Sequence, residues 1–295
     1  MPYSKRKIII LSLMLVVGAF FNYAQAITPP YLDKQKVRLT IAPGDSGYGD
    51  IVITNPGNDT RHLRLYLEDW YYLPAADGTK DFVPANTTPN SCASWISFSP
   101  AEFTLSPFAK QRISFTAKAP AEAKGTYYAV LFFESQEGSA ALVENKGISG
   151  GLNLTIRVGV LFYIEAKGAA EKKADIENLR LSKDKTSGSL LVETDFHNIG
   201  TTDITAGGSF HIMDKDGLIL ARSEFNNVYT FPGNSAKLKS EWKEKITKGK
   251  YDLVLTIDIG KAQEEAGISR GPVMIKEAQI EIGNNGEVLS IGELK

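Results

Sequence analysis

The residue types that perform catalysis occur in this chain, but their spacing builds no catalytic or metal site. Cys92 is the only cysteine, and Asp214 and Asp216 begin a series of oxygen ligands that no glutamate closes as a calcium loop requires. We therefore interpret the run 214–217 as a hairpin turn. No histidine stands at a metal-ligand spacing from another histidine or from the cysteine; the three are His62, His197 and His211. The sequence predicts a protein that is not an enzyme and has no metal and no cofactor.

The charge of the chain bears on its partners, and its cysteine content bears on what stabilises its fold. The net charge is −1, and no large basic or acidic block occurs, so we expect no nucleic acid partner. A single cysteine cannot form a disulfide within the chain, so apolar cores must hold the fold. The hydrophobic share of 43% is sufficient for such cores. Trp70, Tyr71 and Tyr72 could stack on a sugar, but we favour packing in a core or at its rim.

The N-terminus has the anatomy of a secretory signal peptide. Residues 5–7 are basic, residues 8–21 are apolar, and residues 24–26, Ala-Gln-Ala, form a small-x-small cleavage site. The apolar run is shorter than the roughly 20 residues that a membrane-spanning helix needs. We expect cleavage after residue 26, no membrane insertion afterwards, and a periplasmic or secreted mature protein.

Short runs of alternating apolar residues, bounded by Gly, Pro, Asn and Asp, recur through the rest of the chain and indicate β-strands. The expected strands are 36–42, 48–55, 61–72, 95–98, 103–105, 111–118, 126–133, 152–164, 179–181, 189–197, 208–214, 218–224, 235–242, 251–259 and 274–282. We expect a long loop over 74–90 and a linker in the charged stretch Lys167 to Asp175. Two sets of strands predict an all-β fold of two immunoglobulin-like β-sandwich domains, 27–168 and 169–295, after a cleaved signal peptide, residues 1–26.

The strand 152–164 is long and carries a branched or aromatic apolar residue at every second position. Alternate side chains of a strand share one face. We predict that the first part of this strand, with Leu152, Leu154, Ile156 and Val158, presents an apolar row to a partner strand or to a second copy of the chain. The alternative is that the whole row faces the domain's own core, because an exposed edge promotes aggregation.

The first half of the chain also contains a series of short motifs. They are Trp95-Ile96, Ser99-Pro100, Phe103-Thr104-Leu105, Pro107, Gln111 to Phe115, Pro120, Gly125 to Phe132 and Leu161-Phe162-Tyr163. This series resembles the N-terminal domain of the PapD-like periplasmic chaperones of pilus assembly and, more distantly, the WxL-interacting surface proteins. The resemblance covers about residues 35–165.

The resemblance implies that the first domain binds an exported subunit. In that family an arginine of the first strand and a lysine just before the Leu-Phe-Tyr segment hold the subunit's C-terminal carboxylate, and the last long strand lends apolar side chains to the subunit. Here Val160 precedes that segment and Leu39 stands near the arginine position, while Arg38 and Arg157 lie nearby, out of register. We include Arg38 and Arg157 with the apolar row as candidate partner-binding residues.

The expected function is that of a periplasmic chaperone-like protein that binds exported surface or pilus-type subunits by β-strand addition. Its partners would be protein subunits of the cell envelope or of pili, and self-association would use the same strand. Two alternatives belong to other classes. One is a non-catalytic structural or adhesive protein of the cell envelope, and the other is a periplasmic enzyme or carbohydrate-binding module.

Overall fold

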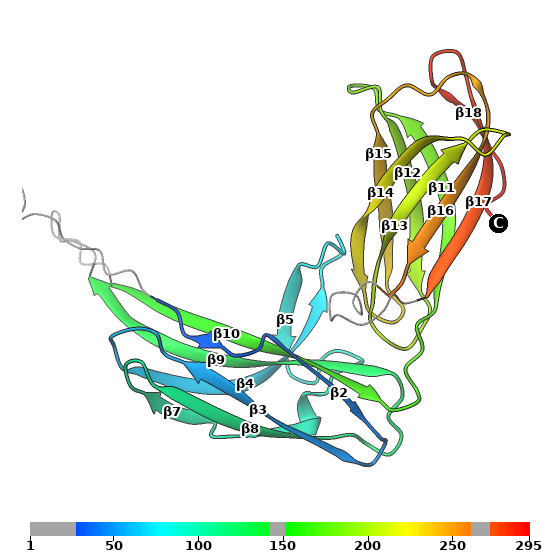
Figure 1. Cartoon of the computed structure of the whole chain (residues 1–295). Coiled ribbons are helices and arrows are strands. Elements are labelled where there is room, and N and C mark those ends of the chain that lie inside the picture. Colours follow the sequence, from blue (N-terminus) through cyan, green and yellow to red (C-terminus); the bar gives the residue numbers. More distant parts are fainter. Residues whose placement is uncertain (1–27, 142–150, 261–271) are drawn as a thin grey trace, which may run out of the picture.

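The computed structural model describes residues 28–141, 151–260 and 272–295. Among these residues the only helical element is the 3₁₀ turn η2 (Ala93–Trp95), and all other regular elements are strands. The strands form two sandwiches, one within residues 31–166 and the other within residues 174–291 (Figure 1). The expectation of an all-β chain with two immunoglobulin-like sandwiches is confirmed. The predicted signal peptide lies outside the described residues, and the described part of the chain holds no helix that could span a membrane.

The first sandwich packs a four-stranded sheet against a six-stranded one. Its strands are β1 (Tyr31–Leu32), β2 (Lys36–Ile41), β3 (Ser46–Thr54), β4 (Arg61–Tyr72), β5 (Lys80–Pro84), β6 (Ile96–Ser99), β7 (Glu102–Leu105), β8 (Lys110–Lys118), β9 (Thr126–Ala141) and β10 (Gly151–Ala166). The smaller sheet has the order β1-β3-β8-β6, and the larger has the order β2-β10-β9-β4-β5, with β7 beside the start of β4. These orders correspond to the two sheets of an immunoglobulin domain, with the N-terminal strand divided between them as β1 and β2.

The core of the first sandwich follows from the alternation within these strands. Ile51 of β3 lies opposite Ile113 of β8, and both are 0% exposed. Phe133 of β9, also 0% exposed, belongs to the same cluster and comes from the other sheet. Burying each such side chain contributes roughly 1.5–3 kcal/mol. The expectation that apolar cores hold this chain together therefore has a clear structural basis.

The second sandwich packs a three-stranded sheet against a five-stranded one. Its strands are β11 (Ala174–Lys183), β12 (Leu190–Asn198), β13 (Ile204–Met213), β14 (Ile219–Thr230), β15 (Ser235–Trp242), β16 (Gly249–Asp258), β17 (Val273–Ile282) and β18 (Val288–Ile291). The orders are β11-β12-β15 and β14-β13-β16-β17-β18. Phe196, Phe210 and Leu253 are 0% exposed and form the centre of its core.

Two expectations about connecting segments need correction. The stretch 74–90, expected to be a long loop, contains β5, which forms a hairpin with the end of β4. β5 is a short edge strand, so its sequence lacks a clear apolar alternation. The expected linker ends earlier than Asp175, because β11 begins at Ala174. The predicted domain boundary, 168/169, falls between β10 and β11, and its role as a limit between independently folding units stays a prediction.

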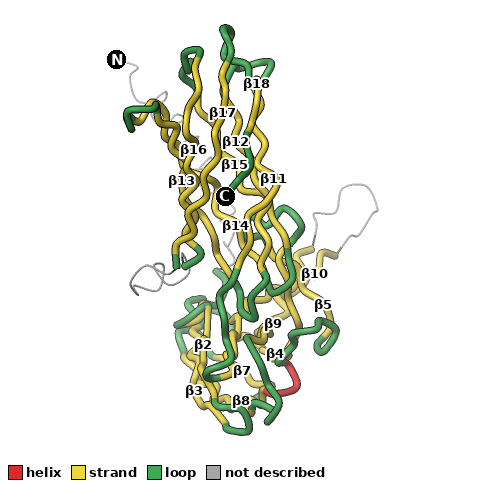
Figure 2. Tube along the Cα trace, turned by 90° about the vertical axis from the view of Figure 1, so that its right-hand side faces the viewer, coloured by secondary structure: helices red, strands yellow, loops and turns green. Residues whose placement is uncertain are grey.

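The two sandwiches lie end to end at an angle, and the β4–β5 hairpin rises from the first toward the second (Figure 1). Figure 2 shows the same arrangement after a turn of 90°. The hairpin touches the second sandwich, because the amide of Tyr229 donates to the carbonyl of Ala76 at 2.9 Å. A second contact joins the amide of Thr126 to the carbonyl of Thr201 at 2.9 Å. The concave side of the molecule therefore has one wall from each sandwich.

Candidate functional site

One edge of β10 is only partly occupied. On one side β10 pairs with β9 from Gly151 to Glu165. On the other side it pairs in parallel with β2, and this ladder begins only at Leu161. Among the described residues no strand pairs with the stretch 151–160 on that side. This stretch, which we call the open edge, has no strand partner on that side within residues 28–141, 151–260 and 272–295, although Tyr31 and Leu32 of β1 line a groove together with Val158 and Gly159.

The direction of the backbone groups at the open edge follows from one hydrogen bond. The amide of Leu161 donates to the carbonyl of Gln35 at 3.0 Å, on the side of β2. Successive amides in a strand point to opposite sides. The amides of Thr155, Arg157 and Gly159 therefore point toward the open edge, and those of the residues between them point toward β9.

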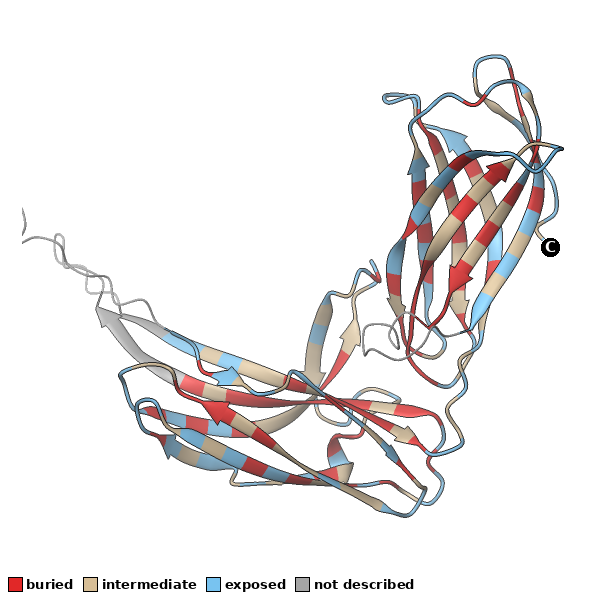
Figure 3. Cartoon of the chain, in the orientation of Figure 1, coloured by how far each residue is buried: buried red, intermediate tan, exposed pale blue. Residues whose placement is uncertain are grey.

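The apolar row of β10 is exposed near the N-terminal end of the strand and buried near its C-terminal end (Figure 3). Three residues of its second half are each 0% exposed and lie in the core: Val160, Phe162 and Ile164. Val158 packs at the margin of that core, Ile156 is half-buried, and Leu154 is 38% exposed. Only the C-terminal half of the row therefore lies in the domain's own core, and its N-terminal part extends beyond that core.

The sequence left two hypotheses for this row, presentation to a partner and packing in the domain's own core, and each describes part of it. Its second half faces the core, as the alternative held, and Leu154 is exposed, as the presentation of a row requires. Leu152 belongs to β10, but its side chain lies outside the described part of the structure. Binding of a partner by Leu152, Leu154, Ile156 and Val158 stays a prediction.

Arg38, a candidate partner-binding residue, forms an ion pair between the sandwiches. Its Nη1 and Nη2 atoms lie 3.2 and 2.9 Å from Oδ1 and Oδ2 of Asp203. Its guanidinium carbon also lies 4.3 Å from the ring centre of Tyr163. The side chain of Asp203 is only 6% exposed, so its charge requires a cation nearby. Because Arg38 is engaged within the molecule, we expect it to position the second sandwich rather than to receive a partner's carboxylate.

Arg157, the other candidate arginine, lies on the face of β10 opposite to the apolar row. Its guanidinium carbon lies 4.3 Å from the ring centre of Phe132, and Nη1 lies 3.4 Å from Oε2 of Glu68. Its side chain is 43% exposed. The structure therefore gives the two arginines different partners and different surroundings, and only Arg157 lies along the open edge.

Two lysines face the cleft between the sandwiches, beside the start of β2. The Nζ atom of Lys36 lies 5.2 Å from the ring centre of Tyr163, and that of Lys80 lies 5.4 Å from the ring centre of Tyr72. Both lysines line one hollow. Among the described residues neither has a carboxylate within ion-pair distance. Burial, and secondarily the positive charge of Lys36, lowers the pKa of Lys80. An anion would be stabilised there, since it would offset both effects.

An aromatic cluster closes the floor of the cleft. The rings of Tyr128 and Phe231 stack with centres 3.9 Å apart, which joins β9 to the second sandwich. Trp70 packs beside them, 1% exposed, and its Nε1 donates to the carbonyl of Ala129 at 3.1 Å. Trp70 is therefore a packing residue, and its ring is not available to stack on a sugar.

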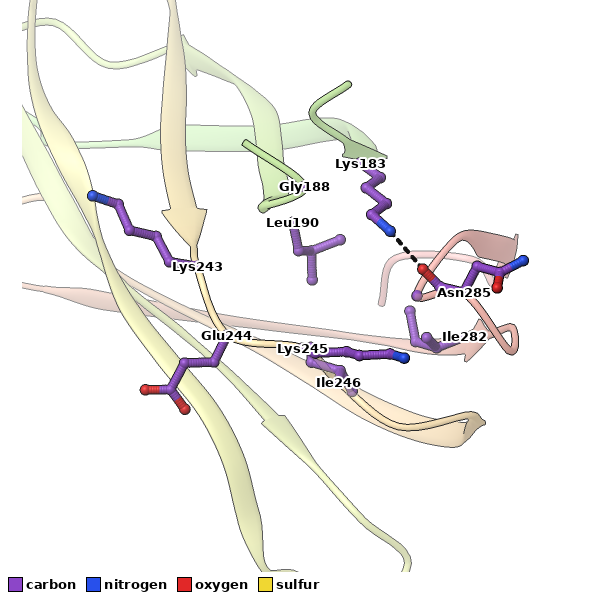
Figure 4. A pocket seen from close by; sticks show the side chains of 10 residues that line it. Lys183, Gly188, Leu190, Lys243, Glu244, Lys245, Ile246, Ile282 and Asn285 are labelled. Atoms are coloured by element: carbon purple, nitrogen blue, oxygen red, sulfur yellow. Dashed lines mark hydrogen bonds between the residues drawn. The ribbon is translucent and has the colours of Figure 1, made fainter. Parts of the chain in front are cut away.

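A small cavity of about 140 Å³ lies among the loops at the far end of the second sandwich (Figure 4). Lys183 donates to the carbonyl of Asn285 at its margin, and Leu190 and Ile282 supply apolar walls. Its lining residues include no histidine, no cysteine and only one carboxylate, Glu244.

The remaining residues singled out in the sequence have structural surroundings. Asp214 Oδ1 accepts from the amides of Asp216 and Leu218, each at 2.9 Å, so the predicted hairpin turn is confirmed. Cys92 is 0% exposed. The three histidines lie in β4, β12 and β13, and the described residues contain no group of three or more potential metal ligands.

Lys36, Lys80 and Asp203 were missed by the sequence analysis. No motif marks them, because they come from β2, from the β4–β5 hairpin and from the second sandwich, and they lie close together only in the folded chain. A weak signal existed for Asp203, since it is an acidic residue next to the apolar run that opens β13.

No protein-family model and no curated protein sequence matches the chain. The similar solved structures are from chaperones of pilus assembly. The class 5 fimbriae chaperone CfaA is 12% identical, with 84% of this chain and 98% of that chain covered and a TM-score of 0.45. A chain of the Salmonella enterica complex of the SafA pilin with the SafB chaperone is 12% identical, with coverage of 85% and 97% and a TM-score of 0.42. A chain of the Acinetobacter baumannii CsuC–CsuE chaperone–adhesion subunit complex is 10% identical, with coverage of 84% and 98% and a TM-score of 0.42. These scores are low, so function has to be argued from the site itself.

Proposed function

We propose that this protein is a periplasmic chaperone-like protein that binds exported surface or pilus-type subunits by adding a strand of the subunit to the open edge of β10. The observation that carries the proposal is the unpaired stretch 151–160, along which the apolar row emerges from the core at Ile156 and Leu154. An added strand would bond to the free amides of this stretch, and its apolar side chains would cover the exposed part of the row. No step of this role requires a catalytic group.

Charge favours one direction for the added strand. β2 occupies the remainder of the same edge and runs parallel to β10. An added strand with the same direction would end just before Lys36, so that its C-terminal carboxylate would lie beside Lys36 and Lys80. A strand of the opposite direction would place its N-terminal ammonium group next to the same two cations, which like-charge repulsion disfavours. The lysine pair therefore supports a parallel strand with a free C-terminus.

The test of this proposal removes one backbone donor from the open edge and leaves the ladder with β9 intact. Thr155→Pro does this, because the Thr155 amide points to the open edge, where proline is tolerated. Thr155→Ala is the matched control, since it keeps the N–H group. The probe is a fluorescein-labelled peptide that alternates valine and threonine and ends in a free carboxylate. We expect fluorescence anisotropy to show about tenfold weaker binding to Thr155→Pro and unchanged binding to Thr155→Ala.

Two results would contradict the proposal. One is equal binding of the peptide by the native chain and by Thr155→Pro. The other is a chain that binds no peptide but dimerises through this edge, which light scattering would reveal as a dimer that Thr155→Pro converts to a monomer. The second result would favour the structural or adhesive alternative.

A further inference from the structure

The loop 199–203, which joins β12 to β13, is held from two sides where the sandwiches meet, and we call it the junction loop. Its central residue, Thr201, uses every polar group that it has. The amide donates to the carbonyl of Glu171, and the hydroxyl donates to the carbonyl of Ala169 and accepts from the amide of Glu171, each at 2.9 Å. The carbonyl of Thr201 accepts from the amide of Thr126, also at 2.9 Å. Thr201 thus ties the second sandwich both to the linker and to the first sandwich.

The contact between the first sandwich and the junction loop is buried. The side chains of Thr126 and Thr202 are both buried, and their hydroxyl oxygens lie 2.8 Å apart in a hydrogen bond. The next residue, Asp203, forms the ion pair with Arg38. Breaking a buried hydrogen bond leaves polar groups without partners, which is costly. The junction loop therefore resists separation from the first sandwich.

Gly125 allows the two segments to approach this closely. Its φ is +79°, a left-handed conformation that glycine adopts readily. A Cβ atom at this position would lie 2.2 Å from the carbonyl oxygen of Thr201 and 3.0 Å from its Cβ atom. The nearer atom belongs to the backbone, which cannot rotate away as a long side chain can. Any side chain at position 125 would therefore push the junction loop away from the first sandwich.

The junction loop leads into the wall of the hollow that contains Lys36 and Lys80. The second sandwich contributes three residues to the lining of this hollow: Asp203, Thr205 and Tyr229. The two lysines belong to the first sandwich, so a change in the angle between the sandwiches would alter the shape of the hollow. Two domains joined by a linker are expected to move relative to each other unless their interface prevents it. Because the junction loop lies beside the linker, a small displacement there becomes a larger one across the cleft.

We propose that Gly125 and Thr201 set the angle between the two sandwiches and, through it, the spacing of the site for a partner's C-terminal carboxylate. Both are positioning residues, because neither lines the hollow. The second part of this inference rests on the proposed strand addition, whereas the first part concerns the protein alone. The ion pair of Arg38 and Asp203 has a different role, since flexible side chains can follow a change of angle that the backbone at Gly125 cannot.

The test compares Gly125→Ala with the matched control Gly168→Ala. Gly168 has a similar φ of +76°, but among the described residues, chain neighbours apart, a Cβ atom there would meet nothing within 4 Å. Both variants therefore carry a similar backbone strain, and only Gly125→Ala adds a clash. Thr201→Val and Thr201→Ser form a second pair, because valine removes the hydroxyl group and serine keeps it.

The angle is measured without a ligand. Nitroxide labels on Glu102→Cys and Lys215→Cys place one probe on each sandwich, at exposed positions. The native Cys92 is buried and stays unlabelled. Double electron–electron resonance should give the native distance distribution for the two control variants, and a shifted or broadened distribution for Gly125→Ala and Thr201→Val.

The same variants are then titrated with the valine–threonine peptide in its free-carboxylate form and in its amidated form. We expect Gly125→Ala to bind the free form roughly threefold to tenfold more weakly, because the carboxylate no longer fits its charged partners. It should bind the amidated form with native affinity, since that form has no carboxylate to place. Gly168→Ala should bind both forms with native affinity.

Three results would overturn the inference: a native distance distribution in Gly125→Ala, an equal change in Gly168→Ala, or an equal loss of affinity for the two forms of the peptide. If Gly125→Ala does not fold, the two Thr201 variants decide in the same way. If the native chain binds neither form, strand addition fails, and the distance measurement alone decides whether Gly125 and Thr201 set the angle.

Discussion

Arg38 and Asp203 form a bidentate ion pair across the two sandwiches, with N–O distances of 3.2 and 2.9 Å. The pair is asymmetric, because the side chain of Asp203 is 6% exposed and that of Arg38 is 38% exposed. Asp203 depends on its partner more than Arg38 does. Arg38 retains water and the ring of Tyr163, whereas Asp203 without Arg38 would be a largely buried charge.

This asymmetry predicts unequal effects of the two single substitutions. Arg38→Met should lower the free energy of unfolding by about 2 kcal/mol, less than for a fully buried pair because Arg38 is partly solvated. Asp203→Asn should lower it by about 1 kcal/mol or less. Urea denaturation measures both values. Neither variant should change the affinity for the valine–threonine peptide by more than a small factor. A large loss of peptide binding in Arg38→Met with unchanged stability would instead make Arg38 a partner-binding residue.

The apolar row of β10 predicts opposite outcomes for the same substitution at its two ends. Leu154→Asp should leave stability almost unchanged, because Leu154 is 38% exposed, and should abolish peptide binding. Val160→Asp should cost several kcal/mol, because Val160 is 0% exposed and the charge would be buried without a partner. Thermal unfolding and anisotropy on both variants check this. A fall of many degrees for Leu154→Asp would show that the whole row belongs to the core.

The lysine pair predicts that binding depends on the peptide's C-terminus and on pH. Lys36→Met should weaken binding of the free-carboxylate peptide by roughly threefold to tenfold and leave binding of its amidated form unchanged. The pKa of Lys80 is lowered from 10.5 by burial and by Lys36. As pH rises through that lowered pKa, Lys80 loses its charge, so affinity for the free-carboxylate peptide should begin to fall below pH 10.5. The amidated peptide is the control, and an identical pH profile for both peptides would exclude the lysine pair as a carboxylate site.

Much of the fold could be predicted because its signal is local. β4 and β15 have the expected bounds, Arg61–Tyr72 and Ser235–Trp242. Buried and exposed residues alternate through most of β15 and from Arg61 to Leu65 in β4, and such alternation is visible in a single sequence. The long apolar row of β10 was visible for the same reason. Its division into a buried and an exposed half was not, because the length of the covering sheet decides where the row leaves the core.

The parts that could not be predicted depend on contacts between distant segments. Arg38 and Asp203 are 165 positions apart, and nothing near either residue indicates the other. β5 gains its place from pairing with β4 and from the docking of its hairpin, not from its own alternation. Val160 needed no such distant contact to be recognised. Its position in the apolar row, directly before Leu161, is visible in the sequence, and in the structure its side chain is 0% exposed.

The β4–β5 hairpin predicts a specific weak point in the junction between the sandwiches. Ala76, at the tip of the hairpin, is 4% exposed and packs within the core of the second sandwich. Ala76→Glu should bury an unpaired carboxylate there, or else release the hairpin, and should lower the free energy of unfolding by about 2 kcal/mol. Ala75→Glu is the matched control, because Ala75 is exposed and its side chain stays in water.

Limited proteolysis distinguishes release of the hairpin from general destabilisation. If Ala76→Glu releases the hairpin, cleavage within residues 74–79 should become much faster than in the native chain, while the strands of both sandwiches stay resistant. Ala75→Glu should be cleaved at the native rate. The hollow that contains Lys36 and Lys80 has the hairpin as one wall, so release should also weaken binding of the free-carboxylate peptide. Unchanged cleavage of the hairpin together with native peptide affinity in Ala76→Glu would show that the hairpin does not hold the cleft in shape.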